Sequence, residues 1–327
     1  MRIEKEIPLS DFERAAQEKS NNLKIILVTP YFIYSRLILK NLEKFRKPTD
    51  IAMPIIPSTK NKIEHIKHEL PGTPNPVRVA IFKKANLKQK SLPLFLFIHG
   101  GGFLGGDSII NEGLMRLIAD ELDIIVATVD YNVSPEVTFP VPLNECHEGL
   151  DFILKRYSVN PTQIFLAGDS AGGNLAATLT LKLLDAGRIT PKGQILLYPV
   201  CDFTNLDTES YRQKGAAYAL MRKGIRLSRN VYVPDKKEWH NPYVSPQCAE
   251  FTSPQPDSLV LVADCDGLRS DGLNYSEKLE AANTHVRTVL YKGAYHSFIN
   301  DLHRSEIADD AANEILSFIK QRIEVKE

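Results

Sequence analysis

Near its middle the sequence reads Phe165-Leu166-Ala167-Gly168-Asp169-Ser170-Ala171-Gly172-Gly173-Asn174. The apolar residues before the first glycine predict a short buried strand, and apolar residues at helical spacing follow Asn174. A single serine therefore stands at a strand-to-helix turn in the pattern G-x-S-x-G. Glycines permit such a tight turn, and the N-terminus of a helix stabilises negative charge that develops beside it. The stretch predicts that Ser170 is a nucleophile, although a glycine-rich turn with an incidental serine would have the same pattern.

Composition and charge argue against several classes of protein. Lys+Arg and Asp+Glu both number 40, so the formal net charge is zero and nothing favours binding to nucleic acid or to an anionic membrane. The four cysteines form no C-x-x-C pair, which is typical of free thiols in a reducing compartment and predicts neither a disulfide framework nor a metal site. They are Cys146, Cys201, Cys248 and Cys265.

The N-terminal region carries mixed charges and predicts no signal peptide. Its most apolar part, residues 23–39, is interrupted by Lys24, Pro30 and Arg36 and is too short to span a bilayer. We therefore expect a cytoplasmic protein without a transmembrane segment.

From residue 92 onward, apolar runs alternate with helical patterns. The runs predict strands at residues 94–98, 124–129, 164–167, 195–198, 259–263 and 286–291. The patterns between and after them predict helices at residues 109–122, 143–157, 175–186, 273–282 and 306–323. Such alternation indicates an α/β fold with a mostly parallel central sheet and helices on both faces. Before it, residues 63–70 and 77–82 alternate apolar and polar side chains and predict an antiparallel pair at a sheet edge.

Two segments stand outside this alternation. Residues 1 to about 50 look helical and amphipathic, in two or three pieces. About sixty residues, rich in aromatic and cationic side chains, separate Tyr198 from Leu259, and an ordinary α/β connection needs far fewer. We expect a single domain over residues 1–327, with a helical cap formed by residues 1–50 and an insertion at about 203–250.

A second glycine-rich motif, His99-Gly100-Gly101-Gly102-Phe103, directly follows the strand predicted at residues 94–98. Consecutive glycines let backbone N–H groups converge on one point, as in the HGGG-type oxyanion loop. We assign the oxyanion donors to the N–H groups of Gly101, Gly102 and Ala171. A phosphate cradle is the alternative, but the G-K-[ST] ending of a P-loop is missing. His99 is expected to orient the loop and not to act as a base.

A base and an acid are expected after the last two strands. His296 follows the strand at 286–291 and can accept the serine proton. Three aspartates follow the strand at 259–263, and Asp266 fits the acid best. Asp264 lies close to the strand end and stays open as the alternative, whereas Asp271 fits the first turn of the next helix. The order Ser170, Asp266, His296 is that of α/β-hydrolases.

Six blocks of the sequence together resemble the hormone-sensitive-lipase-like carboxylesterases, also called bacterial esterase family IV, a branch of the α/β-hydrolases. The resemblance spans roughly residues 92–300. Its blocks are His99-Gly100-Gly101-Gly102-Phe103, Asp130-Tyr131-Asn132-Val133-Ser134-Pro135-Glu136, Gly168-Asp169-Ser170-Ala171-Gly172-Gly173, Asn241-Pro242-Tyr243-Val244-Ser245-Pro246, Asp266-Gly267-Leu268-Arg269 and His296-Ser297-Phe298.

The resemblance implies ester hydrolysis through an acyl-enzyme, without a cofactor, beneath a cap made from the N-terminus and an insertion. It places the catalytic acid at Asp266, the first aspartate of the family's D-P-L-R-D motif. The sequence departs from that motif at Gly267, in place of proline, and at Ser270, in place of the second aspartate. These departures leave the local turn undefined by sequence.

We therefore expect a serine carboxylesterase that acts on small esters of short to medium acyl chains. An amidase or aryl-formamidase would use the same residues, and a non-catalytic small-molecule receptor on this fold is a further alternative. The oligomeric state is open, with a homodimer as one option. Aromatic candidates for the pocket walls are Phe103, Tyr198, Phe203, Tyr211, Trp239 and Phe298.

Overall fold

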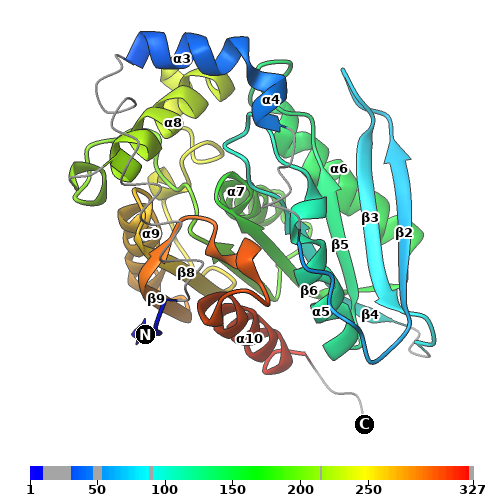
Figure 1. Cartoon of the computed structure of the whole chain (residues 1–327). Coiled ribbons are helices and arrows are strands. Elements are labelled where there is room, and N and C mark those ends of the chain that lie inside the picture. Colours follow the sequence, from blue (N-terminus) through cyan, green and yellow to red (C-terminus); the bar gives the residue numbers. More distant parts are fainter. Residues whose placement is uncertain (10–30, 47–53, 88–90, 214–215, 324–327) are drawn as a thin grey trace.

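A computed structural model describes residues 1–9, 31–46, 54–87, 91–213 and 216–323. Within these ranges the chain forms a nine-stranded sheet flanked by helices (Figure 1). The strand order is β1-β9-β8-β7-β6-β4-β5-β3-β2. The strands are β1 (Arg2–Glu6), β2 (Ile63–Leu70), β3 (Val77–Lys84), β4 (Leu92–Ile98), β5 (Ile125–Asp130), β6 (Val159–Asp169), β7 (Gly193–Leu197), β8 (Asp257–Cys265) and β9 (Val286–Tyr295).

The strands from β1 to β5 in this order are all parallel, and β3 and β2 complete the sheet as antiparallel neighbours. The predicted α/β class and the predicted antiparallel edge pair are both confirmed. The pairing of Ile63 with Lys84 and Leu70 with Val77 joins β2 and β3 along their full length. β4 is buried at every position, which explains its continuous apolar run.

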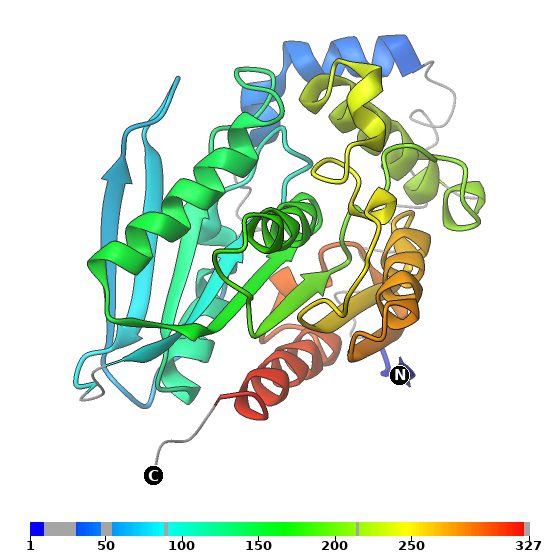
Figure 2. The same ribbon diagram turned by 180° about the vertical axis from the view of Figure 1, so that it is seen from behind.

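Helices cover both faces of the sheet, as expected. On one face lie α6 (Val141–Arg156), α7 (Ala171–Asp185) and α9 (Arg269–Ala281), which Figure 2 shows in front of the strands. On the other lie α5 (Glu112–Glu121) and α10 (Glu306–Lys320). Each layer closes its own apolar core: Leu150 and Leu179 belong to one, and Ile118 and Ile315 to the other.

Three further helices lie beyond the carboxyl ends of the parallel strands, at the top of Figure 1. They are α3 (Tyr31–Lys40), α4 (Leu42–Arg46) and α8 (Ala216–Tyr232). The described residues also include short 3₁₀ segments in the connections between these elements. They are η1 (Ser108–Asn111), η2 (Ser210–Arg212), η3 (Lys236–His240), η4 (Pro246–Cys248) and η5 (Phe298–Asp301). α3 packs on α8, where the Tyr31 hydroxyl accepts a hydrogen bond from the Asn230 amide at 3.1 Å. No helix in the described ranges is long and apolar enough to cross a membrane.

The prediction of two or three helical pieces over residues 1 to about 50 was wrong at its beginning. Arg2–Glu6 forms β1, which pairs with the outer edge of β9. Ile3 and Lys5 are half-buried, whereas Arg2, Glu4 and Glu6 are exposed. An alternation over only five residues is too short to be recognised in sequence. Pairing with a free strand edge overrides local propensity here. Residues 10–30 and 47–53 of that prediction lie outside the described part of the chain.

Candidate active site

Each predicted site segment directly follows a parallel strand. The glycine-rich loop begins after β4, Ser170 follows β6, Asp266 follows β8 and His296 follows β9. Because the carboxyl ends of parallel strands share one edge of a sheet, the topology brings these four segments together. The helices α3 and α8 lie beyond this same edge (Figure 1).

The backbone around Ser170 forms a sharp turn between β6 and α7. Ser170 has φ 53° and ψ −116°, and its N–H donates to the Leu197 carbonyl at 2.9 Å. Two residues on, a Cβ at Gly172 would lie 2.0 Å from the Ile98 carbonyl oxygen of β4. Only glycine fits that position, so the turn can bring the start of α7 against the neighbouring strand.

Ser170, His296 and Asp266 form one line of hydrogen bonds. Nε2 of His296 lies 2.9 Å from Oγ of Ser170, and its Nδ1 lies 2.7 Å from Oδ2 of Asp266. Oδ1 of the same carboxylate accepts the N–H of Leu268 at 2.9 Å, and Asp266 is 2% exposed. A carboxylate at Nδ1 fixes the proton there, which leaves Nε2 free to accept the serine proton.

The surroundings of His296 favour its charged form. Burial lowers the pKa of this imidazole. The charge and hydrogen bond of Asp266 and the charge of Asp169 raise it by more than burial lowers it, so the net pKa lies above its ordinary value. The aromatic ring of Tyr198 packs edge-on against the imidazole, with 4.9 Å between centroids. The carboxylates of Asp266 and Asp169 thus stabilise a protonated imidazole at this position.

Asp264, the alternative acid, points elsewhere. It is the penultimate residue of β8, and its Oδ1 pairs with Arg269 at 3.2 Å. Its side chain is 24% exposed, whereas that of Asp266 is fully buried. The geometry therefore favours Asp266 as the partner of His296.

The glycine-rich loop is held against the serine turn by buried polar contacts. Oδ1 of Asp169 accepts the N–H of Gly100 at 2.7 Å. His99 donates from Nδ1 to the Gly100 carbonyl at 2.7 Å and stacks on Tyr131. Gly101 and Gly102 follow with positive φ, and in the described residues neither N–H donates to a protein acceptor. These two N–H groups and the first N–H of α7, at Ala171, are therefore available to bind an anionic oxygen.

Comparison with known proteins agrees with this fold. A sequence model of the alpha/beta hydrolase fold matches residues 95–300. The chain belongs to this family. Its motifs place it in the hormone-sensitive-lipase-like branch of the α/β-hydrolases.

Three relatives of the chain are named as ester hydrolases. "Carboxylic ester hydrolase LipN" of Mycobacterium tuberculosis is 31% identical over 71% of this chain and 64% of its own length. An "Esterase" of Acinetobacter venetianus is 30% identical over 68% of this chain and 74% of its own. A solved structure of a fungal esterase from Rhizomucor miehei matches with a TM-score of 0.79 at 27% identity, over 97% of both chains. The chain thus spans a little under two thirds of LipN but nearly all of the fungal structure.

In this α/β-hydrolase the predicted pocket aromatics are mostly buried in packing around the site. Phe103 stacks on Tyr232 of α8 at 4.0 Å and meets Phe203 edge-on at 5.9 Å. Tyr198 and Phe298 pack together beside His296. Tyr211 lies against Gly267, and the half-buried Trp239 stacks under the guanidinium of Arg229 at 3.6 Å. Their role as pocket walls stays a prediction.

Several residues near the site had no signal in the sequence. Arg46 of α4 donates from Nε to the Leu104 carbonyl at 2.7 Å, and its two terminal nitrogens bind Ser134 and both carboxylate oxygens of Glu136. Oγ of Ser228, on α8, lies 2.9 Å from where a Cβ of Gly102 would stand. These contacts join positions far apart in the chain, and neither residue belongs to a recognisable motif.

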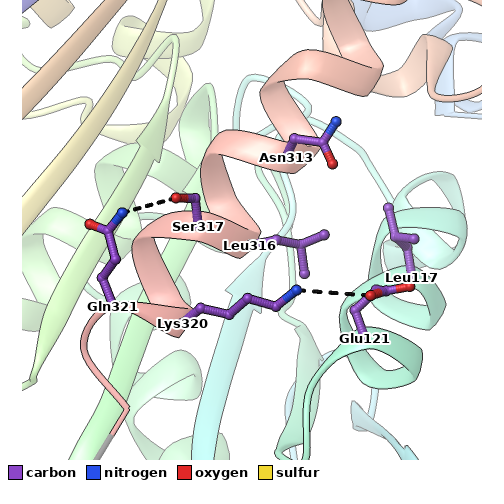
Figure 3. Close-up of a pocket in the computed structure, with 7 residues that line it drawn as sticks. All are labelled: Leu117, Glu121, Asn313, Leu316, Ser317, Lys320 and Gln321. Atoms are coloured by element: carbon purple, nitrogen blue, oxygen red, sulfur yellow. Dashed lines mark hydrogen bonds and ion pairs between the residues drawn. The ribbon is translucent and has the colours of Figure 1, made fainter.

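A surface groove of about 490 Å³ lies between α5 and α10 and contains none of these residues (Figure 3). An ion pair from Lys320 to Glu121, 3.9 Å long, crosses it. Within the described ranges no group of three or more His, Cys, Asp or Glu side chains is arranged to hold a metal ion.

Proposed function

We propose that this α/β-hydrolase is a serine carboxylesterase that cleaves small esters of short to medium acyl chains. Ser170 is the nucleophile, His296 the general base and acid, and Asp266 the residue that orients and stabilises the imidazolium. The N–H groups of Gly101, Gly102 and Ala171 bind the oxyanion. The proposal rests above all on the unbroken line of hydrogen bonds from Ser170 through His296 to Asp266.

Acylation begins when Oγ of Ser170 attacks the ester carbonyl carbon while its proton passes to Nε2 of His296. The carbonyl oxygen becomes anionic and receives hydrogen bonds from the Gly101, Gly102 and Ala171 N–H groups. The tetrahedral adduct then collapses, the bond to the alcohol oxygen breaks, and His296 gives its proton to the departing alcohol. The acyl group remains on Ser170 as an ester.

Deacylation repeats these steps with water as the nucleophile. His296 takes a proton from the water, which attacks the acyl carbon, and the same N–H groups bind the second oxyanion. Collapse of this adduct releases the carboxylic acid and returns the proton to Oγ of Ser170. The sum of the two halves is ester plus water to acid plus alcohol, with no cofactor.

The preference for short to medium acyl chains rests on the segments above the site. We propose one domain over residues 1–327 whose cap combines the N-terminal arm with the insertion at 203–250. Tyr232 and Ser228 of α8 touch Phe103 and the Gly102 position, which brings the roof close to the oxyanion loop. A close roof leaves little length for an acyl chain.

The unpaired state of all four cysteines supports a reducing, cytoplasmic location.

A panel of nitrophenyl esters, from acetate to palmitate, tests the proposal on the wild type beside Ser170→Ala. We expect highest kcat/KM at short or medium chains and a loss of about 10⁶-fold in kcat in the variant. Matching anilides and formyl-arylamines serve as the amide arm, and turnover there above the esters would favour an amidase. Folded wild type that neither hydrolyses esters nor reacts at Ser170 with an organophosphate would be a receptor.

A further inference from the structure

One serine of the insertion forms hydrogen bonds to the turn that carries the catalytic acid. Ser210, in η2, is fully buried. Its N–H donates to Oγ of Ser270 at 3.2 Å, and its Oγ accepts the Ser270 N–H at 3.2 Å. The same Oγ donates to the Gly267 carbonyl at 2.5 Å. Three hydrogen bonds therefore join η2 to the two positions at which the sequence departs from the family motif.

These contacts act on the peptide groups that orient Asp266. The N–H of Leu268, next to Gly267, donates to Oδ1 of Asp266, and the N–H of Arg269 donates to the Asp266 carbonyl at 3.2 Å. Gly267 and Ser270 thus flank the two residues whose N–H groups hold the acid. Fixing the turn on both sides fixes the carboxylate that binds His296.

Gly267 also lets the insertion come close to this turn. A Cβ there would lie 2.8 Å from Cγ of Met221, on α8, and 3.3 Å from the ring of Tyr211 in η2. A bulkier residue, such as the proline expected from the family motif, would crowd both neighbours. The two departures are therefore linked, because glycine opens the space and Ser270 supplies the partner for Ser210.

A further polar link between the insertion and the acid turn is weaker. Arg269 pairs with Glu209 at 2.9 Å, but the side chain of Glu209 is 78% exposed. Exposed ion pairs contribute little and are screened by salt. Buried groups that lose a hydrogen-bond partner cost much more, and both the Gly267 carbonyl and the Ser270 N–H depend on the Ser210 hydroxyl.

We propose that Ser210 is a positioning residue for the catalytic acid and couples the insertion to the triad. This inference rests on the proposed esterase function. Ser210 bonds to the turn that holds Asp266 and acts on the reaction only through that carboxylate. Without its hydroxyl the turn relaxes, Asp266 rotates, and its contact with His296 weakens.

Weakening the contact between Asp266 and His296 should change the pKa of His296. The groups that face this imidazole are Ser170, Asp266, Asp169 and the ring of Tyr198. Of these groups, only Asp266 lies on the turn to which Ser210 is hydrogen-bonded. A weaker contact with Asp266 lowers the pKa of His296, so the acid limb of kcat/KM moves to lower pH.

The test compares Ser210→Ala with wild type on a short-chain nitrophenyl ester. We expect kcat to fall about ten-fold with KM nearly unchanged, because positioning and not binding is impaired. The acid limb should move to lower pH, and Ser210→Thr, which keeps the hydroxyl, should restore both values. Ser276→Ala is the matched control, since Ser276 is also buried and donates to the Gly272 carbonyl within α9.

The outcomes separate the inference from the function on which it rests. A wild type without esterase activity would remove the function itself. If the wild type is active and Ser210→Ala behaves as Ser276→Ala does, only the role of Ser210 is overturned. Should Ser210→Ala fail to fold, Ser270→Ala removes a single acceptor, and a smaller fall in kcat with the same shift of the limb is expected. An unmoved limb in that variant would overturn the role as well.

Discussion

At the scale of single residues, the proposed mechanism makes the rate depend on the charge of His296. It lies between Ser170 and Asp266, with Asp169 as a second carboxylate nearby. Burial lowers its pKa, and the two acids raise it to a net value above that of an ordinary histidine, about 6.5. Because the base must be neutral, kcat/KM should rise with pH through this raised pKa and then level off.

Asp169→Asn tests how the second carboxylate contributes. The asparagine oxygen can still accept the Gly100 N–H, so the oxyanion loop should stay in place. The lost negative charge lowers the pKa of His296, so the acid limb of kcat/KM should move to lower pH while kcat falls less than about ten-fold. Asp264→Asn is the control, because Asp264 does not act on His296. A limb unmoved by Asp169→Asn would contradict the electrostatic account, and a limb moved by Asp264→Asn would reopen that residue as the acid.

The residues of the site differed in how far sequence could define them. Ser170 and His296 each stand in a short motif after a strand, so position alone selects them. Asp264 and Asp266 follow the same strand two residues apart, so sequence favoured Asp266 but left Asp264 open as the alternative. β8 runs to Cys265, which keeps Asp264 within the strand and puts Asp266 first beyond it. Where a strand ends depends on its neighbours, and local sequence does not contain that information.

At the scale of elements, α4 is tied to the oxyanion loop through Arg46. Its guanidinium binds the Leu104 and Ser134 carbonyls and both carboxylate oxygens of Glu136. Leu104 lies only two residues after Gly102, so α4 holds one end of the loop to which we assign the oxyanion donors. The side chain of Arg46 is 25% exposed, so these bonds are partly shielded from water.

Arg46→Ala should therefore slow the reaction although Arg46 never touches the ester. We expect kcat/KM to fall by about ten-fold or more, because a loop displaced by a fraction of an ångström aims its N–H groups poorly. Arg46→Lys should recover little, since an ammonium cannot form the forked contact with Glu136 and reach two carbonyls. Steady-state kinetics beside Lys44→Ala, an exposed change on the same helix, isolate the effect. Equal kinetics for the two alanine variants would exclude a role for this contact.

The elements themselves were predictable where their residues carry a clear period. The buried runs of β4 and β8 and the amphipathic pattern of α10 were read from sequence because one face or the whole segment is apolar. β1 was missed because its pairing partner, β9, lies about 285 residues away. The contact of η2 with the turn that carries Asp266 was not predictable either, because the sequence around Ser210 does not distinguish it from any other loop serine.

At the scale of the whole molecule, one ion network joins the first strand to the last helix. Lys5 of β1 pairs with Asp310 and Glu314 of α10. Glu314 also accepts hydrogen bonds from Nε and Nη2 of Arg287, on β9, each at 2.7 Å. The hydroxyl of Tyr291 donates to Asp310. The side chain of Glu314 is only 10% exposed, so it is the shielded centre of the network.

Glu314→Gln should destabilise the fold without changing the chemistry at Ser170. Burial raises the pKa of Glu314, but Arg287 and Lys5 more than offset that rise, so the net pKa lies below its usual value. The carboxylate therefore stabilises the protein above the unfolded pKa of about 4.3 and loses this effect as pH falls through the folded pKa. At neutral pH we expect the free energy of unfolding to fall by about 1–2 kcal/mol, between the values of exposed and buried pairs.

Urea unfolding at neutral and acid pH measures this difference. The midpoints of wild type and Glu314→Gln should differ at neutral pH and converge in acid, because a protonated Glu314 and a glutamine are both neutral. Glu4→Gln, an exposed carboxylate on β1 with a 47% exposed side chain, should leave the midpoint nearly unchanged. A gap between wild type and Glu314→Gln that persists in acid would mean that packing, and not charge, holds β1 and α10 together. Unchanged kcat/KM in both variants would show that the network affects stability and not the reaction proposed at Ser170.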